Sequence, residues 1–299
     1  MSVCIRRAWL TQEGESLELE DVEGGWACTL LDLGWPEVRE VMNNRPDQDG
    51  ADDMTKFFGA RAVSADITTT GHAERVDEIA AQFGRFMYPG VRSQLHYVLD
   101  RDDNPERVLV VRPSGYQWPI SGGRSRDISL SWIAADPIAH AAEATVCTAW
   151  AGPSTPGGRT YNWRPNRFYA GAGGARITGY PISKGEVPPD PILRIYGPIT
   201  APQVMLESWL SGKYVQGGQV KFEAGFTIPA GEWVEVDCRF HTARWEGDAR
   251  RSCASSIMWT LTSWPVVMLP PASNMLNLLG SSTDALTQVQ AIWRDGFLT

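Results

Sequence analysis

The chain has 299 residues, and 43% of them are apolar, which is enough to bury the cores of two ordinary domains or one large one. Its formal net charge is −8 and it has no run of five Lys or Arg, so its surface is not expected to grip nucleic-acid phosphates. No apolar stretch reaches the about 18 residues of a membrane span, and none of signal-peptide length follows the two N-terminal arginines. We therefore expect a globular protein that folds in a cytoplasm and does not insert into membranes.

Glycine (29 residues) and proline (20 residues) punctuate the whole chain, a distribution typical of many short strands joined by tight turns. The sequence therefore predicts a mainly β protein. The five cysteines are odd in number, widely spaced and without a CxxC pair, which argues against zinc ribbons and disulfide frameworks. We expect buried, reduced thiols at all of them: Cys4, Cys28, Cys147, Cys238 and Cys253.

The first elements alternate with period two. LELEDV, the Gly24-Gly25 turn and the apolar run from Trp26 to Leu33 are typical of a β-hairpin. The segment NNRPDQDGADD (43–53) is too polar and too rich in turn formers for regular structure, and predicts an exposed loop or arm. The next strand is expected to end at Gly71.

One amphipathic helix is predicted at about 72–88, ending at Pro89-Gly90. Its apolar residues recur at three- and four-residue spacing: Val76, Ile79, Ala80, Phe83, Phe86 and Met87. Three further strands follow, in LHYVLD, RVLVVRP and DISLSWIAA. Residues 1–142 thus read as a small β domain, a β-sandwich or split barrel, with a single helix.

An aspartate and a histidine stand four residues apart in ISLSWIAADPIAHAAE (128–143). We interpret the stretch as a half-buried strand that Asp136-Pro137 ends, because proline cannot donate to a β-ladder. No third group is in sight to make Asp136 and His140 a catalytic pair. The stretch is read as the last strand of the first domain and its exit.

The second half, residues 143–299, begins with a passage rich in glycine and proline (144–190). Short strands then resume at roughly ten-residue spacing, which predicts a β-sandwich. They are ILRIYG, QVMLES, QVKFEAGFTI, WVEVDCRF, SSIMWTLTS, MLNLLG and TQVQAIWRDGF.

No motif in the sequence has the set of residues and the spacing that a known catalytic or ligand-binding site requires. RPDQDGADD lacks the glycine and glutamate positions of a calcium loop, GAGGAR lacks a third glycine, and GPSTPG is not a nucleophile elbow. The four histidines form no metal-binding spacing, and none of the 35 carboxylates is singled out, which leaves a glycosidase pair open. We predict no catalytic, cofactor-binding or metal-binding residues.

Tryptophan is concentrated in the second half: Trp150, Trp163, Trp209, Trp233, Trp245, Trp259, Trp264 and Trp293 follow residue 145. Those in alternating strands, Trp233, Trp259 and Trp293, are expected in the core. Trp163 and Trp245 stand in loop-like contexts and are candidate contacts for a glycan or a partner.

The order of these segments resembles the distal tail protein family of long-tailed, non-contractile bacteriophages. The resemblance covers nearly the whole chain and depends on the order of loose motifs. They are CTLLDLGWPEVREV, QDGADDMTKFFGARAVSADITTTG, the helix, RVLVVRPSGYQWPISGGRSRDISLSWIAADPIAH, ILRIYGPITAP, IPAGEWVEVD and NMLNLLG. The passage 144–190 is longer than the connection typical of the family.

The resemblance implies a structural virion protein at the distal end of the tail, made in the bacterial host cytoplasm. Its N-terminal domain would form a ring of six copies around the tail channel, and its C-terminal domain would be a galectin-like sandwich. The ring would join the tail tube to the hub or tip protein, with the tape-measure protein nearby and DNA passing without specific binding. In the arm that ends at Phe58, candidate contacts to a neighbouring copy are Met54, Phe57 and Phe58.

A second interpretation stays open. The tryptophan-rich sandwich could be a carbohydrate-binding module, or part of a glycan-active protein, that contacts the host cell surface. Because galectin-like folds include both sugar binders and purely structural domains, the fold class cannot decide between the two.

Overall fold

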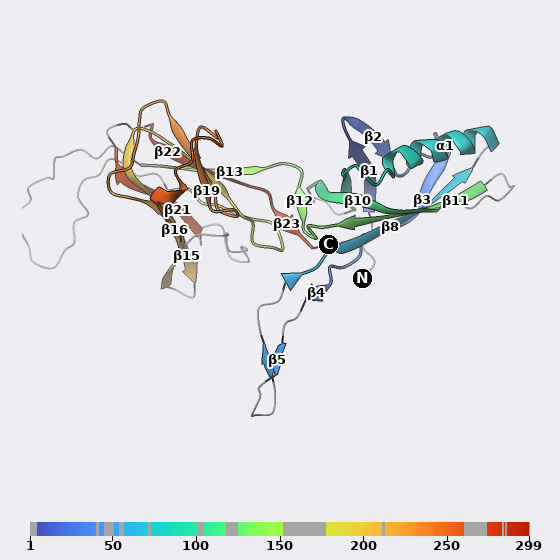
Figure 1. The fold of residues 1–299 in the computed structure, drawn as a ribbon, viewed down its shortest axis with the longest axis horizontal. Coiled ribbons are helices and arrows are strands. Elements are labelled where there is room, and N and C mark those ends of the chain that lie inside the picture. Colours follow the sequence, from blue (N-terminus) through green and yellow to red (C-terminus); the bar gives the residue numbers. More distant parts are fainter. Residues whose placement is uncertain are drawn as a thin grey trace, which may run out of the picture. The chain divides into compact units, whose positions relative to one another are not determined.

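The computed structural model has a mainly β architecture, which confirms the predicted fold class. The chain divides into two compact units: unit 1 comprises Met1–Glu143 and Gly296–Thr299, and unit 2 comprises Ala144–Asp295 (Figure 1). No helix among the described residues is long and apolar enough to cross a membrane. The structure describes residues 5–39, 42–44, 51–53, 57–70, 73–100, 105–117, 125–151, 178–210, 213–259, 274–282, 284 and 286–298.

The end of the chain returns to unit 1, whereas the sequence assigned all of 143–299 to the second domain. β23 (Gly296–Phe297) pairs with β12 (Ala139–Ala141), and β12 pairs with β10. The Phe297 side chain is buried under the guanidinium of Arg107, which lies 3.9 Å from the ring centroid. Because β12 follows Asp136-Pro137, the strand of ISLSWIAA is not the last strand of unit 1.

Unit 1 is built on a nine-stranded antiparallel sheet. Along the main path the strands are β2 (Glu15–Glu18), β1 (Ile5–Gln12), β9 (Ser93–Leu99), β10 (Arg107–Gln117), β11 (Ser125–Ala134), β8 (Arg61–Thr70) and β3 (Trp26–Asp32). The first part of β10 pairs with β9 and its second part with β11, and the register shifts between Pro113 and Gly115. A proline cannot donate to a ladder, so a strand that changes partners is expected to do so there.

The predicted hairpin around Gly24-Gly25 is reduced to a single bridge between Asp21 and Trp26. The turn itself is held by Asp21, whose Oδ1 accepts a hydrogen bond from the Gly24 amide at 2.7 Å. β2 pairs with β1, and β3 pairs with β8. The alternation in the sequence identified the strands but not their partners, because period two fixes only which face each residue takes.

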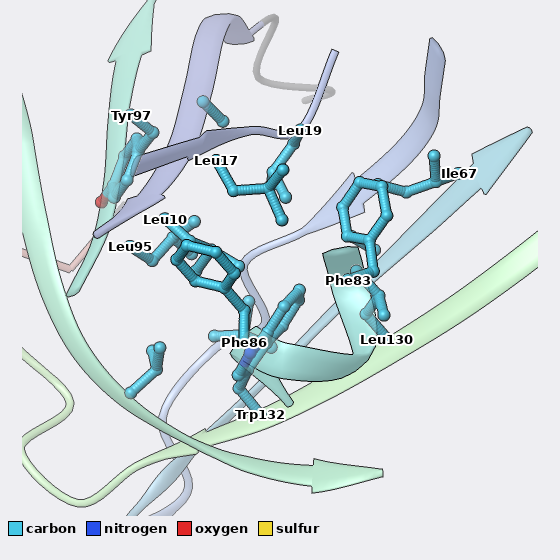
Figure 2. Close-up of a cluster of buried hydrophobic side chains, with 14 of the residues drawn as sticks. Leu10, Leu17, Leu19, Ile67, Phe83, Phe86, Leu95, Tyr97, Leu130 and Trp132 are labelled. Carbon is cyan, nitrogen blue, oxygen red and sulfur yellow. The ribbon is translucent and has the colours of Figure 1, made fainter. Parts of the chain in front are cut away.

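Helix α1 (Ala73–Phe86) packs its apolar face against this sheet. Figure 2 shows Phe83 and Phe86 pointing into a cluster with Trp132, Leu10 and other apolar side chains of the strands. The Phe83 ring meets the Trp26 ring edge-to-face at 6.0 Å between centroids. This contact joins the helix to the edge strand β3, so the core of unit 1 extends to the end of its sheet.

The polar arm contains regular structure, which the sequence did not predict. β4 (Val38–Arg39) pairs with β7 (Phe57–Phe58), and β5 (Met42–Asn44) pairs with β6 (Ala51–Asp53). In Figure 1 this two-stranded ribbon extends away from the sheet of unit 1. Backbone hydrogen bonds can form such a ladder whatever the side chains are, so the polar composition of the segment did not exclude it.

Unit 2 is a sandwich of two five-stranded antiparallel sheets. The first sheet is β13 (Thr145–Trp150), β22 (Gln288–Trp293), β14 (Ile192–Tyr196), β18 (Trp233–Asp237) and β19 (Thr242–Trp245). The second is β17 (Thr227–Ile228), β15 (Ile199–Leu210), β16 (Lys213–Phe222) and β20 (Ile257–Trp259), with β21 (Asn274–Ser281) on β15. Apolar side chains from both sheets form one buried cluster. β13 and β19 were not predicted from the sequence.

Candidate assembly surface

Four exposed apolar side chains lie on β3, just after it, and where the arm begins and ends. Leu30 is 53% exposed, Trp35 60%, Val38 41% and Phe58 42%. Val38 and Phe58 face each other across the β4–β7 pair. We call Trp35, Val38 and Phe58 the arm-base patch. Large apolar side chains that remain exposed together often mark a surface that another protein covers.

The base of the arm is closed by backbone and side-chain contacts. The Gly59 amide donates to the Glu37 carbonyl at 2.6 Å. The buried Arg61 donates through Nε to the Leu33 carbonyl and through Nη1 to the Pro137 carbonyl at 3.3 Å. These bonds hold the start of the arm against the body of unit 1, so the arm-base patch occupies a defined position.

Next to the arm, β3 forms one end of the strand order in unit 1. Its register pairs it with β8. In the described part of the chain no strand covers its other edge. An uncovered edge presents backbone donors and acceptors that can pair with another chain. β3 and the arm-base patch together therefore offer both polar and apolar contacts for another protein chain.

The other sequence-predicted contact residues are placed only in part. Met54 lies outside the described residues, and Phe57 belongs to β7 but its side chain is not described. Trp163 also lies outside them. Trp245 is half-buried and packs against the sandwich core, with its ring 5.5 Å from that of Phe226.

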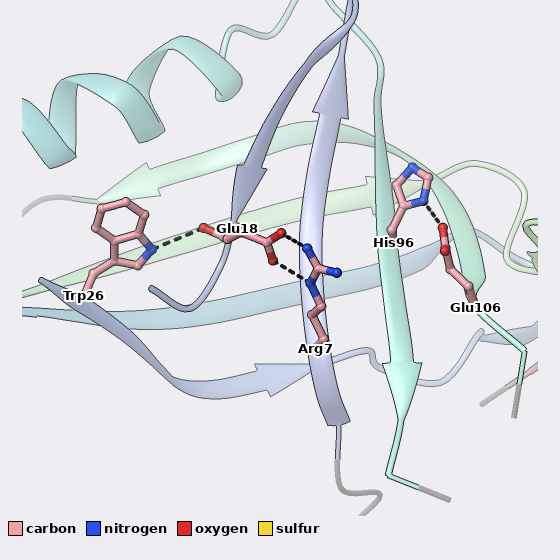
Figure 3. A network of polar contacts seen from close by, with 5 residues as sticks. All are labelled: Arg7, Glu18, Trp26, His96 and Glu106. Atoms are coloured by element: carbon pink, nitrogen blue, oxygen red, sulfur yellow. Dashed lines mark hydrogen bonds and ion pairs between the residues drawn. The ribbon is translucent and has the colours of Figure 1, made fainter. Parts of the chain in front are cut away.

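Thr11 on β1, His96 on β9 and Glu106 just before β10 are linked in the order of a nucleophile, a base and an orienting acid, and sequence reasoning missed this group. Figure 3 shows the contact between His96 and Glu106. His96 Nε2 shares a hydrogen bond with Thr11 Oγ1 at 2.9 Å, and His96 Nδ1 contacts Glu106 Oε1 at 2.7 Å. The Trp9 ring stacks on His96 at 5.1 Å between centroids. The signal in the sequence was only period two, which puts these residues on one face of neighbouring strands.

Among the described residues, the backbone around the Thr11 hydroxyl offers no free amides of the kind that bind an oxyanion in acyl transfer. Thr11 lies inside two ladders, paired with Ser16 of β2 and with Gln94 of β9. Backbone amides within paired strands bond to the neighbouring strands and are not free to stabilise a developing charge. We therefore interpret the contacts of His96 as cross-strand pairs that stabilise the sheet.

Two other groups of potentially reactive side chains are held in unreactive arrangements. Asp136 Oδ2 and His140 Nε2 are 3.9 Å apart, and Asp136 Oδ1 accepts from the Ile138 amide at 3.2 Å, as in a turn. Burial raises the pKa of the Cys28, Cys147 and Cys253 thiols to about 11, so they stay protonated at neutral pH. Within the described ranges, no three His, Cys, Asp or Glu side chains are grouped to hold a metal ion.

Comparison with known proteins gives structural neighbours only. No family model matches the chain, and no curated protein matches its sequence. It is similar in structure to the Dit (gp 19.1) protein of phage SPP1, described as a paradigm of the hub adsorption apparatus in phages that infect Gram-positive bacteria. The TM-score is 0.57, the identity is 11%, and 97% of this chain and 99% of that chain are covered.

Chains of the phage p2 baseplate in its activated conformation match more loosely. With strontium the TM-score is 0.45, at 8% identity over 97% of this chain and 98% of that chain. With calcium the TM-score is 0.42, at the same identity and coverage. The structural neighbours are thus phage hub and baseplate proteins, and the chain shares the fold of SPP1 Dit over nearly the whole length of both.

Proposed function

We propose that the chain is a structural protein of a phage virion, located at the distal end of a long non-contractile tail. The observation that carries this proposal is the fold shared with SPP1 Dit over 97% of one chain and 99% of the other. A likeness that includes both units and their order supports a common role more strongly than a match to one sandwich would. The order of motifs in the sequence supports the same family.

In this proposal copies of unit 1 form a closed ring, with six members as in the family that the sequence resembles. A ring needs a heterologous interface, in which one surface of a copy meets a different surface of the next. The arm-base patch and the open edge of β3 supply one such surface, and Met54 and Phe57 stay sequence-based candidates for the same contact. Burial of the exposed Trp35, Val38 and Phe58 side chains would stabilise the contact.

The ring would join the tail tube to the hub or tip protein, with the tape-measure protein in its channel. Unit 2 would be a galectin-like sandwich outside the ring. The net charge of −8 favours a channel that DNA passes without specific binding. The chain is proposed to act without catalytic residues, cofactor or metal, since the Thr11, His96 and Glu106 contacts stabilise a sheet.

The proposal is tested by co-expressing the tagged chain with the products of the genes that flank its own. We expect a tape-measure gene upstream and a larger tip gene downstream, and co-purification of the tip protein with the tagged chain. A matched control is the chain carrying Leu286→Asp, which changes an exposed side chain of unit 2 and should retain the tip protein. Flanking genes unrelated to tails, with no co-purifying product, would contradict the proposal.

A further inference from the structure

The outer face of the first sandwich sheet carries a continuous row of polar side chains. The register aligns Thr148 of β13, Gln290 of β22, Arg194 of β14, Glu235 of β18 and Arg244 of β19. Residues that alternate with them, such as Leu193, Val236 and Ala291, are buried in the sandwich. The row therefore faces away from the core and crosses all five strands, about 19 Å at the usual strand spacing.

One contact within the row and one from the neighbouring row fix its polar groups. Arg194 Nε donates to Glu235 Oε2 at 3.0 Å, and the Tyr196 hydroxyl donates to Gln290 Oε1 at 3.1 Å. These contacts leave Nε2 of Gln290, the η nitrogens of Arg194 and Oε1 of Glu235 for other partners. Planar groups that are already oriented by neighbours lose little conformational entropy when a ligand binds.

Aromatic side chains lie on one side of the polar row. Tyr196 and Trp233 are paired across β14 and β18, with ring centroids 6.3 Å apart, and Trp150 pairs with Gln288. The three rings are half-buried, and the guanidinium of Arg194 lies 5.2 Å from the Trp233 centroid. An aliphatic row lies on the other side, made of Val146, Ile292 and Ile192.

The charges of the polar row nearly cancel. Glu235 of β18 forms an ion pair with Arg194 of β14 and lies opposite Arg244 of β19. Asp237 lies two residues further along β18, in the adjacent row. A surface that binds nucleic acid or a sulfated polymer would carry an excess of basic side chains. The arrangement instead suits an uncharged ligand with many hydroxyl groups and apolar C–H faces.

We propose that this face binds a neutral oligosaccharide. The hydroxyl groups of several sugar units would bond to Gln290, Arg194 and Glu235, and the apolar faces of their rings would pack on Tyr196 and Trp233. Ligand sites combine aromatic surface with a few placed polar groups in this way. The site differs from the loop tryptophans that the sequence singled out, because it is formed by β13, β22, β14 and β18. It does not depend on the ring, since one chain holds every residue involved.

The test uses the purified full chain and an array of neutral tri- to hexasaccharides built from glucose, galactose and N-acetylglucosamine. Hits are titrated by tryptophan fluorescence. We expect at least one to bind, and Trp233→Ala and Gln290→Ala each to weaken it by about tenfold or more, as loss of a central contact does. Met258→Ala, at a 64% exposed position on the other sheet of the same unit, should leave the affinity unchanged.

Thermal unfolding and far-UV circular dichroism establish that each variant is folded, and Gln290→Ala serves because it removes no buried apolar surface. The proposal is overturned if no oligosaccharide binds, or if folded Trp233→Ala and Gln290→Ala bind as tightly as the unaltered chain. Binding confined to a sulfated probe and lost in salt would also overturn it. A protein partner would then be the better occupant of the face.

Discussion

Arg61 illustrates how single residues set the base of the arm. Its side chain is only 1% exposed, and burial lowers the pKa of its guanidinium. It nevertheless stays charged, because an arginine pKa is far above neutral pH and its donors meet the carbonyls of Leu33 and Pro137. A buried guanidinium that bonds to two chain segments ties them together, and both segments lie beside the arm or β12.

Gly34 is a second residue on which the arm depends. Its φ is +61°, and a Cβ there would lie 2.1 Å from the Ala62 carbonyl oxygen, so only glycine fits. We predict that Gly34→Ala destabilises unit 1 by about 1–3 kcal/mol. Gly84→Ala, in open space on helix α1, should instead stabilise it by about 0.5–1 kcal/mol. Chemical denaturation of both variants measures the difference, and equal stabilities would contradict this account.

The thiols provide a pH-dependent test. An ordinary thiol has a pKa of 9.0, and burial raises that of Cys28, Cys147 and Cys253 to about 11. Because the folded-state pKa is raised, their contribution to stability is complete below pH 9 and is lost as the pH rises toward 11. We expect iodoacetamide at pH 8 to alkylate them much more slowly in the folded than in the unfolded protein, as peptide mapping would measure. Equal rates would show that the thiols are accessible thiolates.

At the scale of elements, helix α1 covers the sheet of unit 1 through one apolar face. We predict that Phe83→Ala, which removes a fully buried ring, costs about 3–5 kcal/mol of unfolding free energy. Gln82→Ala, on the exposed face of the same helix, should change it little. Urea unfolding compares the two variants. If Phe83→Ala lowered the unfolding free energy no more than Gln82→Ala does, the helix would not be packed as described.

Hydrophobic periodicity and turn residues predicted the individual helix and strands better than they predicted which strands pair. The 3.6-residue spacing of Val76, Ile79 and Phe83 indicated the helix, and alternation in ISLSWIAA indicated β11. The partners of β2 and β3 and the return of Phe297 to unit 1 depend on contacts far apart in the chain, which local patterns do not encode. The polar face of the sandwich was missed for the same reason, because its row is assembled from five strands.

At the scale of the whole molecule, the proposed ring requires association between copies through unit 1. We predict that Val38→Asp and Phe58→Asp weaken self-association without unfolding the chain, because each places a charge in a surface that must lose water. Leu286→Asp, at a more exposed apolar position in unit 2, is the control and should associate normally. Sedimentation velocity over a range of concentrations compares the three. If both patch variants associated as the unaltered chain does, the arm-base patch would not be part of the interface.

The most direct test of the central claim is the mass of the purified full chain in solution, measured by light scattering after size exclusion. We predict a closed assembly of six copies, each of 33.0 kDa, or the same ring once the tip protein is added. Electron micrographs of that species should contain rings with a central channel. A mass of one chain at every concentration, with and without the tip protein, would contradict it.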